Sequence, residues 1–145
     1  MSLWQKGLRM AIGKMPKIID PTTHAVLDCV VAGSFVVMGV VFWNRRKRAS
    51  IGSLLCGGAA VANIMLTDYS GNSRKLISYK AHERVDMGLA GMTAAIPGLL
   101  RFGDKPESRF FEIKALAETA IIGLTDFDHY EDSSLAPMLR DKQEG

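Results

Sequence analysis

The chain has few of the residue sets that give small proteins a recognisable chemistry. It has two cysteines in 145 residues, Cys29 and Cys56, and neither belongs to a Cys-x-x-Cys pair. We expect both to be buried thiols that act as small apolar side chains. The sequence also lacks a glycine-rich phosphate loop, a nucleophile beside a base, and cysteines and histidines at zinc-finger spacing. These absences argue against the common classes of hydrolase, nucleotide-binding protein and zinc finger.

The chain also has no large excess of positive or negative charge. The 18 Lys and Arg residues nearly balance 15 Asp and Glu, which leaves a net charge of +3. The dense basic run is confined to residues 45–48, and so small and dispersed a charge argues against nucleic acid as a partner. Near the N-terminus the basic residues alternate with apolar ones, so we expect no signal peptide.

Long apolar runs are the main feature of the sequence. They cover residues 25–43, 51–67, 85–100 and 113–125. The first has 19 residues with one charge, close to the roughly 20 that a helix needs to cross a bilayer. The first two runs show no polar stripe, which a helix of a soluble bundle should have. A four-helix membrane bundle therefore explains the runs better than the alternative, a soluble helical bundle, and the fold class is all-α in both cases.

The two ends of the chain differ from these runs. Within residues 1–19, apolar side chains fall on one helical face and most basic side chains lie off it, which is typical of an amphipathic helix lying in the membrane interface. A frayed basic tail, or a helix packed on a partner protein, is the alternative. Residues 128–145 are acidic and polar, and we expect a solvent-exposed tail there.

The middle of the chain repeats itself with a shift of 58 residues. Between residues 22–69 and 80–127, 12 of 48 positions are identical, several times what chance gives. Asp20 and Ser78 correspond, and both residue types favour the N-cap of a helix. We therefore predict two units, residues 20–77 and 78–127, each of two membrane helices. Because each unit crosses the membrane twice, the two units form parallel rather than inverted repeats.

Each unit carries the pattern His-x-x-x-Asp, then Gly, and a second helix that ends in Thr-Asp-aromatic. The second unit also has a Pro and a Phe near the turn between its two helices. The first unit has the pattern at His24, Asp28, Gly33, Thr67, Asp68 and Tyr69, and the second at His82, Asp86, Gly91, Pro97, Phe102, Thr125, Asp126 and Phe127. In this pattern the chain resembles the bacterial SPW-repeat membrane proteins, although the Ser-Pro-Trp signature itself is missing. The resemblance implies a bundle of membrane helices and no particular activity.

The repeated polar residues are the candidate site. His24 and Asp28 share a helix face, as do His82 and Asp86, because residues four apart stack on a helix. Each second helix ends on the same side of the bilayer, and this adds Thr67, Asp68, Thr125 and Asp126. One interpretation is a polar clamp that fixes helix register in lipid. A second is a haem or metal site formed by His24, His82, Asp28 and Asp86. A third is the handling of protons or quinones.

From the sequence we expect a non-catalytic structural or accessory subunit, although an enzyme is not excluded. The alternative is a protein that binds a cofactor, either haem or metal, or handles protons or quinones with the His and Asp sets. The expected partners are the lipid bilayer and other membrane protein subunits or a second copy, and the expected location is a bacterial cytoplasmic membrane. Glu118, inside the fourth run, is expected to pair with Arg84 or Lys114.

Overall fold

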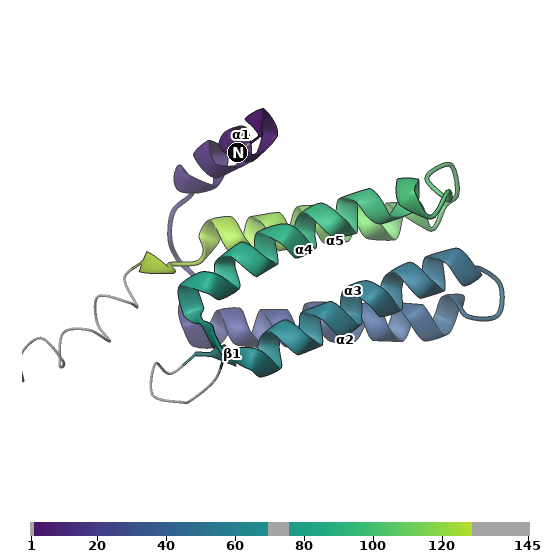
Figure 1. The fold of residues 1–145 in the computed structure, drawn as a ribbon, viewed down its shortest axis with the longest axis horizontal. Coiled ribbons are helices and arrows are strands. Elements are labelled where there is room, and N and C mark those ends of the chain that lie inside the picture. Colours follow the sequence, from purple (N-terminus) through teal and green to yellow (C-terminus); the bar gives the residue numbers. More distant parts are fainter. Residues whose placement is uncertain (1, 70–75, 129–145) are drawn as a thin grey trace, which may run out of the picture.

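A computed structural model describes residues 2–69 and 76–128, without the side chains of Trp4, Gln5, Leu8, Arg9 and Ile12. These residues form five helices and one two-stranded parallel sheet (Figure 1), so the all-α fold class is confirmed. The elements are α1 (Leu3–Gly13), α2 (Pro21–Phe42), α3 (Lys47–Leu66), β1 (Thr67–Asp68), β2 (Ile77–Ser78), α4 (Tyr79–Leu99) and α5 (Ser108–Leu124). The predicted polar tail lies outside the described residues, apart from Asp128.

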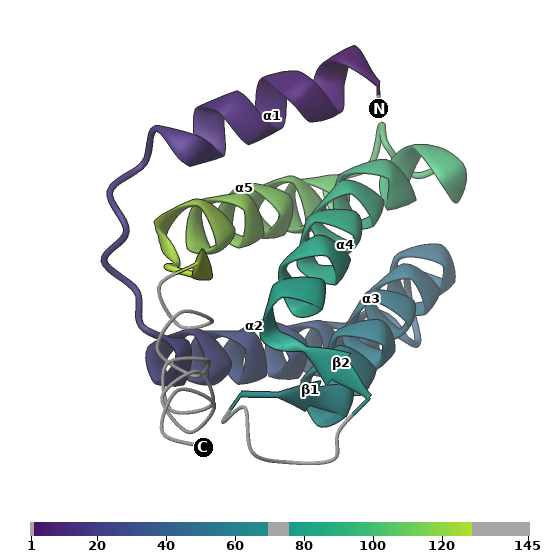
Figure 2. The same ribbon diagram turned by 60° about the vertical axis from the view of Figure 1, so that its left-hand side comes forward.

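Two helical hairpins make up the bundle. The helix α2 packs along α3, and α4 packs along α5, while α3 contacts α4 and α2 contacts α5. The helix α1 runs beside α5 on the outside of this bundle (Figure 2). The four long helices therefore surround one interior, to which both hairpins contribute.

Short backbone pairings join the start of each hairpin to the end of the other. Thr67, directly after α3, pairs with Ile77, directly before α4. Ile19, before α2, pairs in the same parallel sense with Thr125, after α5. The two pairings join residues that correspond under the shift of 58 positions. They place the first turns of α2 and α4 beside the last turns of α5 and α3.

The larger of two apolar core clusters lies toward the opposite end of the bundle. Its buried members come from all four long helices and the loop after α4: Phe35, Ala49, Cys56, Ile96, Phe102 and Phe111. Cys56 is buried as expected, but the expectation of a buried Cys29 is wrong. Cys29 is exposed because it lies beside Val26 and Val30 on the outer side of α2.

The outer surface of α2 is apolar. Val26, Val30, Val37 and Val41 follow helical spacing and are each 59–63% exposed. By length and composition, α2 and α3 are the two described helices able to cross a membrane. The helix α5 has only 17 residues, and α4 carries four charged residues among its first eight. The structure thus supports two of the four predicted membrane helices.

Candidate metal centre

Helix caps fix where His24 and His82 lie on their helices. The Asp20 side chain accepts hydrogen bonds from the backbone N–H groups of Thr22 and Thr23, at 2.9 and 3.1 Å, and Pro21 follows as the first residue of α2. The Ser78 side chain accepts one from Ala81 N–H at 3.2 Å. Both predicted N-caps are therefore confirmed. Hydrogen bonds from the Thr23 hydroxyl and backbone lower the pKa of Asp20, which keeps the capping carboxylate charged.

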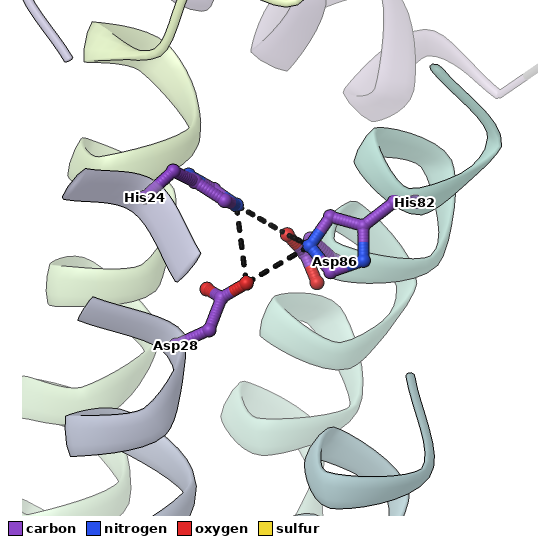
Figure 3. Close-up of side chains that lie close together, drawn as sticks. All are labelled: His24, Asp28, His82 and Asp86. Atoms are coloured by element: carbon purple, nitrogen blue, oxygen red, sulfur yellow. Dashed lines mark hydrogen bonds and ion pairs between the residues drawn. The ribbon is translucent and has the colours of Figure 1, made fainter. Parts of the chain in front are cut away.

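His24, Asp28, His82 and Asp86 converge between α2 and α4, and we call them the His–Asp cluster (Figure 3). His24 Nε2 lies 3.3 Å from Asp28 Oδ2 and 3.1 Å from Asp86 Oδ2. His82 Nε2 lies 2.9 Å from Asp28 Oδ2 and 3.0 Å from Asp86 Oδ2. Imidazole and carboxylate thus alternate around a closed ring, and each histidine contacts the aspartate of both hairpins.

The cluster is almost completely removed from solvent within the chain. Both histidine side chains have no exposed surface, and the side chains of Asp28 and Asp86 are 14% and 12% exposed. Aromatic rings close the histidine side: the Tyr79 ring stacks on His82, and the Phe127 ring meets His24 edge-on. Burial on this scale strengthens every electrostatic contact within the ring.

Two threonines fix which nitrogen of each histidine carries a proton. The Thr125 hydroxyl donates to the Ile121 carbonyl and lies 2.8 Å from His24 Nδ1. Because that hydroxyl hydrogen is already used, the Thr125 oxygen accepts from His24 Nδ1–H. Thr67 repeats the arrangement: its hydroxyl donates to the Asn63 carbonyl and lies 2.8 Å from His82 Nδ1.

It follows that both Nε2 atoms face the carboxylates. In a neutral imidazole with its proton on Nδ1, Nε2 presents a lone pair, which is the form that binds metal ions. In the imidazolium form, Nε2–H instead donates to the carboxylates. The same four atoms therefore suit either a metal ion or two shared protons.

Each aspartate has one further polar partner, and these partners differ between the hairpins. Asn63 Nδ2 donates to Asp86 Oδ1 at 2.8 Å. The Tyr69 hydroxyl donates to Asp28 Oδ2 at 3.2 Å. Burial and the nearby Asp28 carboxylate raise the pKa of the Tyr69 phenol, so its hydroxyl stays protonated and able to donate. The residues that correspond to Asn63 and Tyr69 in the second unit are Ile121 and Phe127, which offer no such donor.

The predicted site residues divide into two groups. The four His and Asp residues form the cluster, and Thr67 and Thr125 hold its histidines. Asp68 and Asp126 are placed one residue beyond these threonines, in the extended segments that pair with the opposite hairpin. Sequence reasoning did not identify Asn63 as a site residue. Asn63 is nevertheless an isolated amide in an uncharged run, four residues before Thr67, and such a residue indicates a buried polar contact.

The cluster has the dimensions of a metal site. Its four ring contacts span 2.9–3.3 Å, and the four ligand atoms all lie within 4.8 Å of one another. Four atoms that form a square with edges of this length lie about 2.2 Å from its centre. Metal–nitrogen and metal–oxygen bonds in proteins measure about 2.0–2.2 Å. A haem does not suit the site, because Asp28 and Asp86 bridge the two histidines and the adjacent cavity measures only about 30 Å³.

Comparison of the chain with protein-family models, with curated proteins and with solved structures finds no match.

Proposed function

We propose that the chain is a small integral membrane protein that binds one divalent transition-metal ion in the His–Asp cluster. The observation that carries the proposal is the closed ring of two Nε2 and two carboxylate oxygen atoms. Both histidines in this ring are oriented by a threonine on their Nδ1 side. Such oriented ligands are typical of metal sites, where the second nitrogen donates a hydrogen bond outside the coordination shell.

In its neutral-imidazole form, the cluster has a charge that suits a divalent cation. With neutral imidazoles, the ring carries two negative charges and has no other charged partner within 4.0 Å among the described residues. Two adjacent buried carboxylates are costly in a low-dielectric interior. One divalent ion neutralises both. Imidazole and carboxylate ligands together suit zinc, iron and manganese, whereas a soft ion such as Cu(I) prefers sulfur.

The membrane part of the proposal is supported by the surface of all four long helices. Large apolar side chains are exposed on each of them, including Val37 on α2, Leu55 on α3, Leu99 on α4 and Leu116 on α5. At 1.5 Å per residue, α4 and α5 are about 31 and 26 Å long, near the roughly 30 Å of a hydrocarbon core. Lys80, Glu83 and Arg84 lie in the first two turns of α4, at the level expected for headgroups, and Asp86 follows them in the His–Asp cluster. The helix α1 runs beside α5, so its expected position in the membrane interface stays a prediction from the sequence. The resemblance to SPW-repeat proteins favours a bacterial cytoplasmic membrane.

Metal titration of the protein purified in detergent tests the proposal. We expect one Zn²⁺ or Co²⁺ per chain, and at least a hundredfold weaker binding in His24→Ala and in His82→Ala. His129, outside the described residues, supplies the matched control, and His129→Ala should bind as the unchanged chain does. Equal binding by all three variants would exclude the His–Asp cluster as the site.

A second candidate function, packing against another membrane protein, is favoured by one surface feature. The outer side of α4 and α5 carries a groove of about 610 Å³ lined largely by small residues, among them Gly91, Ala94, Ala95 and Ala115. Small residues let helices approach closely in lipid. Stoichiometric co-purification with a larger membrane complex, lost in Ala94→Leu, would support an accessory role. A free chain in mild detergent would argue against it.

A further inference from the structure

A small, partly open cavity adjoins the His–Asp cluster on the side of the bundle interior. It measures about 30 Å³ and is lined by His24, Asp28 and Asp86 from the cluster. Beyond these, its polar lining comes from Thr93 on α4 and Glu118 on α5, and most of the remaining wall is apolar. A water molecule needs a cavity of roughly 10–15 Å³, so this cavity has room for about two water molecules.

Glu118 lines this cavity, and one of its two carboxyl oxygen atoms has no hydrogen-bond partner among the described residues. That oxygen atom, Oε2, is buried. Lys114, one turn earlier on α5, instead donates to the Ser34 hydroxyl on α2 at 2.6 Å. The expected ion pair with Arg84 or Lys114 is also not among the described ion pairs within 4.0 Å. A buried carboxyl oxygen without a donor is costly, and a polar occupant of the cavity removes that cost.

The position of Glu118 breaks the symmetry of the two hairpins. Under the shift of 58 residues Glu118 corresponds to Ala60, and both residues line the same cavity. At this pair of corresponding positions, the second unit therefore supplies a carboxyl group and the first unit supplies a methyl group. A structural clamp between two equivalent hairpins does not need a carboxyl group on one side only. A single carboxyl group does suit a cavity that holds one small polar molecule.

We propose that the cavity is the place where the metal ion takes an exogenous ligand, a water molecule that coordinates the ion and donates a hydrogen bond to Glu118. This inference rests on the proposed metal-binding function. The four protein ligands leave the cavity side as the approach to the ion, because three of them line it. The size and the apolar wall restrict the ligand to a small molecule with an oxygen or nitrogen donor, such as water.

Manganese-loaded protein in detergent tests the inference directly. In ¹⁷O-enriched water, electron–nuclear double resonance of Mn²⁺ detects oxygen atoms of bound water. We expect an ¹⁷O signal in the unchanged chain and in Glu118→Gln, whose amide oxygen still accepts a hydrogen bond. The signal should be lost in Ala60→Leu, which fills the cavity, and strongly reduced in Glu118→Leu.

Glu112→Leu is the matched control, because Glu112 lies on the same helix but lines the outer groove instead. It should keep the signal. The manganese content of every variant is measured in parallel. It reports on the metal site, whereas the ¹⁷O signal reports on the water site, so the two proposals are tested separately. Normal manganese content with an unchanged ¹⁷O signal in Ala60→Leu and Glu118→Leu would overturn the water site alone. Failure of the unchanged chain to bind manganese, cobalt or zinc would overturn both proposals.

Discussion

The Thr125 hydroxyl oxygen lies 2.8 Å from Nδ1 of His24, although 101 residues separate the two in the chain. Thr67 and His82 show the same relationship at the same distance. In both cases the histidine stands in the first turns of a hairpin's first helix, and the threonine follows a second helix. The orientation of each imidazole is therefore set by a hydroxyl that the docking of the helices brings to it.

Removing either hydroxyl should weaken metal binding. Thr67→Val and Thr125→Val keep the shape of the side chain but remove the acceptor for Nδ1–H, so the imidazole loses its orientation. Loss of such an outer hydrogen bond typically costs about 10–100-fold in metal affinity. Competition with a chromophoric zinc chelator measures the change.

Thr119→Val is the control for this pair. The Thr119 hydroxyl also donates to the carbonyl four residues before it, at 2.8 Å from Ala115 O, but Thr119 lines the outer groove and not the His–Asp cluster. Its replacement should leave metal affinity unchanged. An equal loss in all three variants would attribute the effect to the threonine–carbonyl hydrogen bond that they share, rather than to the histidines.

Asn63 should matter for metal binding, although its counterpart in the second unit is an isoleucine. Asn63→Leu leaves the Asp86 carboxylate without its 2.8 Å amide donor, and we expect about tenfold weaker metal binding. Asn44→Leu, in the exposed loop between α2 and α3, changes the same residue type and should have no effect on metal affinity. If both variants bind metal as the unchanged chain does, the Asn63 bond is not part of the site.

Close packing between α2 and α3 depends on Gly57. A methyl group on Gly57 would lie 3.0 Å from Phe35 Cβ and 3.3 Å from the backbone nitrogen of Val36, so α2 has to move. Overpacking of this kind costs about 1–3 kcal/mol. Gly57→Ala should therefore lower the free energy of unfolding measured by denaturing-detergent titration.

The next residue provides the comparison. Nothing lies within 4 Å of a methyl group on Gly58, so Gly58→Ala meets open space. It should leave stability unchanged or slightly raised, because alanine favours the helix. Equal destabilisation by the two substitutions would contradict the packing of α2 against α3 described above.

The cap of α2 gives a pH-dependent contribution to stability. The pKa of Asp20 is lowered below its ordinary value of 3.8 by the Thr23 hydroxyl and backbone. Its contribution is therefore present above that value and is lost as the pH falls through the lowered pKa. Asp20→Asn keeps a capping oxygen that does not titrate, so its melting temperature should fall less than that of the unchanged chain at low pH. If the melting temperatures of the two proteins fall equally at low pH, the Asp20 carboxylate does not stabilise α2 as a cap.

The sequence predicts the four long helices and the starts of α2 and α4, because these features depend on local residues. The runs at 25–43 and 51–67 lie within or near α2 and α3, and Asp20 and Ser78 begin α2 and α4 as predicted. These features follow from capping chemistry and from long apolar runs, and neither requires knowledge of distant contacts.

The partners within the site were less accessible to sequence reasoning. Residues four apart identify His24 with Asp28, but they cannot show that His24 also contacts Asp86 and Thr125, because that depends on how two hairpins dock. Glu118 and Lys114 also stand four apart, which favours an ion pair. In the structure Lys114 reaches across to α2, where it hydrogen-bonds Ser34 and lies over the ring of Phe35.

X-ray absorption spectroscopy of the zinc-loaded protein in detergent tests the central claim most directly, because it reports the ligand atoms themselves. The account predicts nitrogen and oxygen ligands at about 2.0 Å, with the outer-shell scattering of two imidazole rings. In Asp28→Ala and Asp86→Ala the oxygen contribution should fall while imidazole scattering remains. Sulfur at about 2.3 Å, from Cys29 or Cys56, or a spectrum without imidazole scattering, would contradict a metal ion held by the His–Asp cluster.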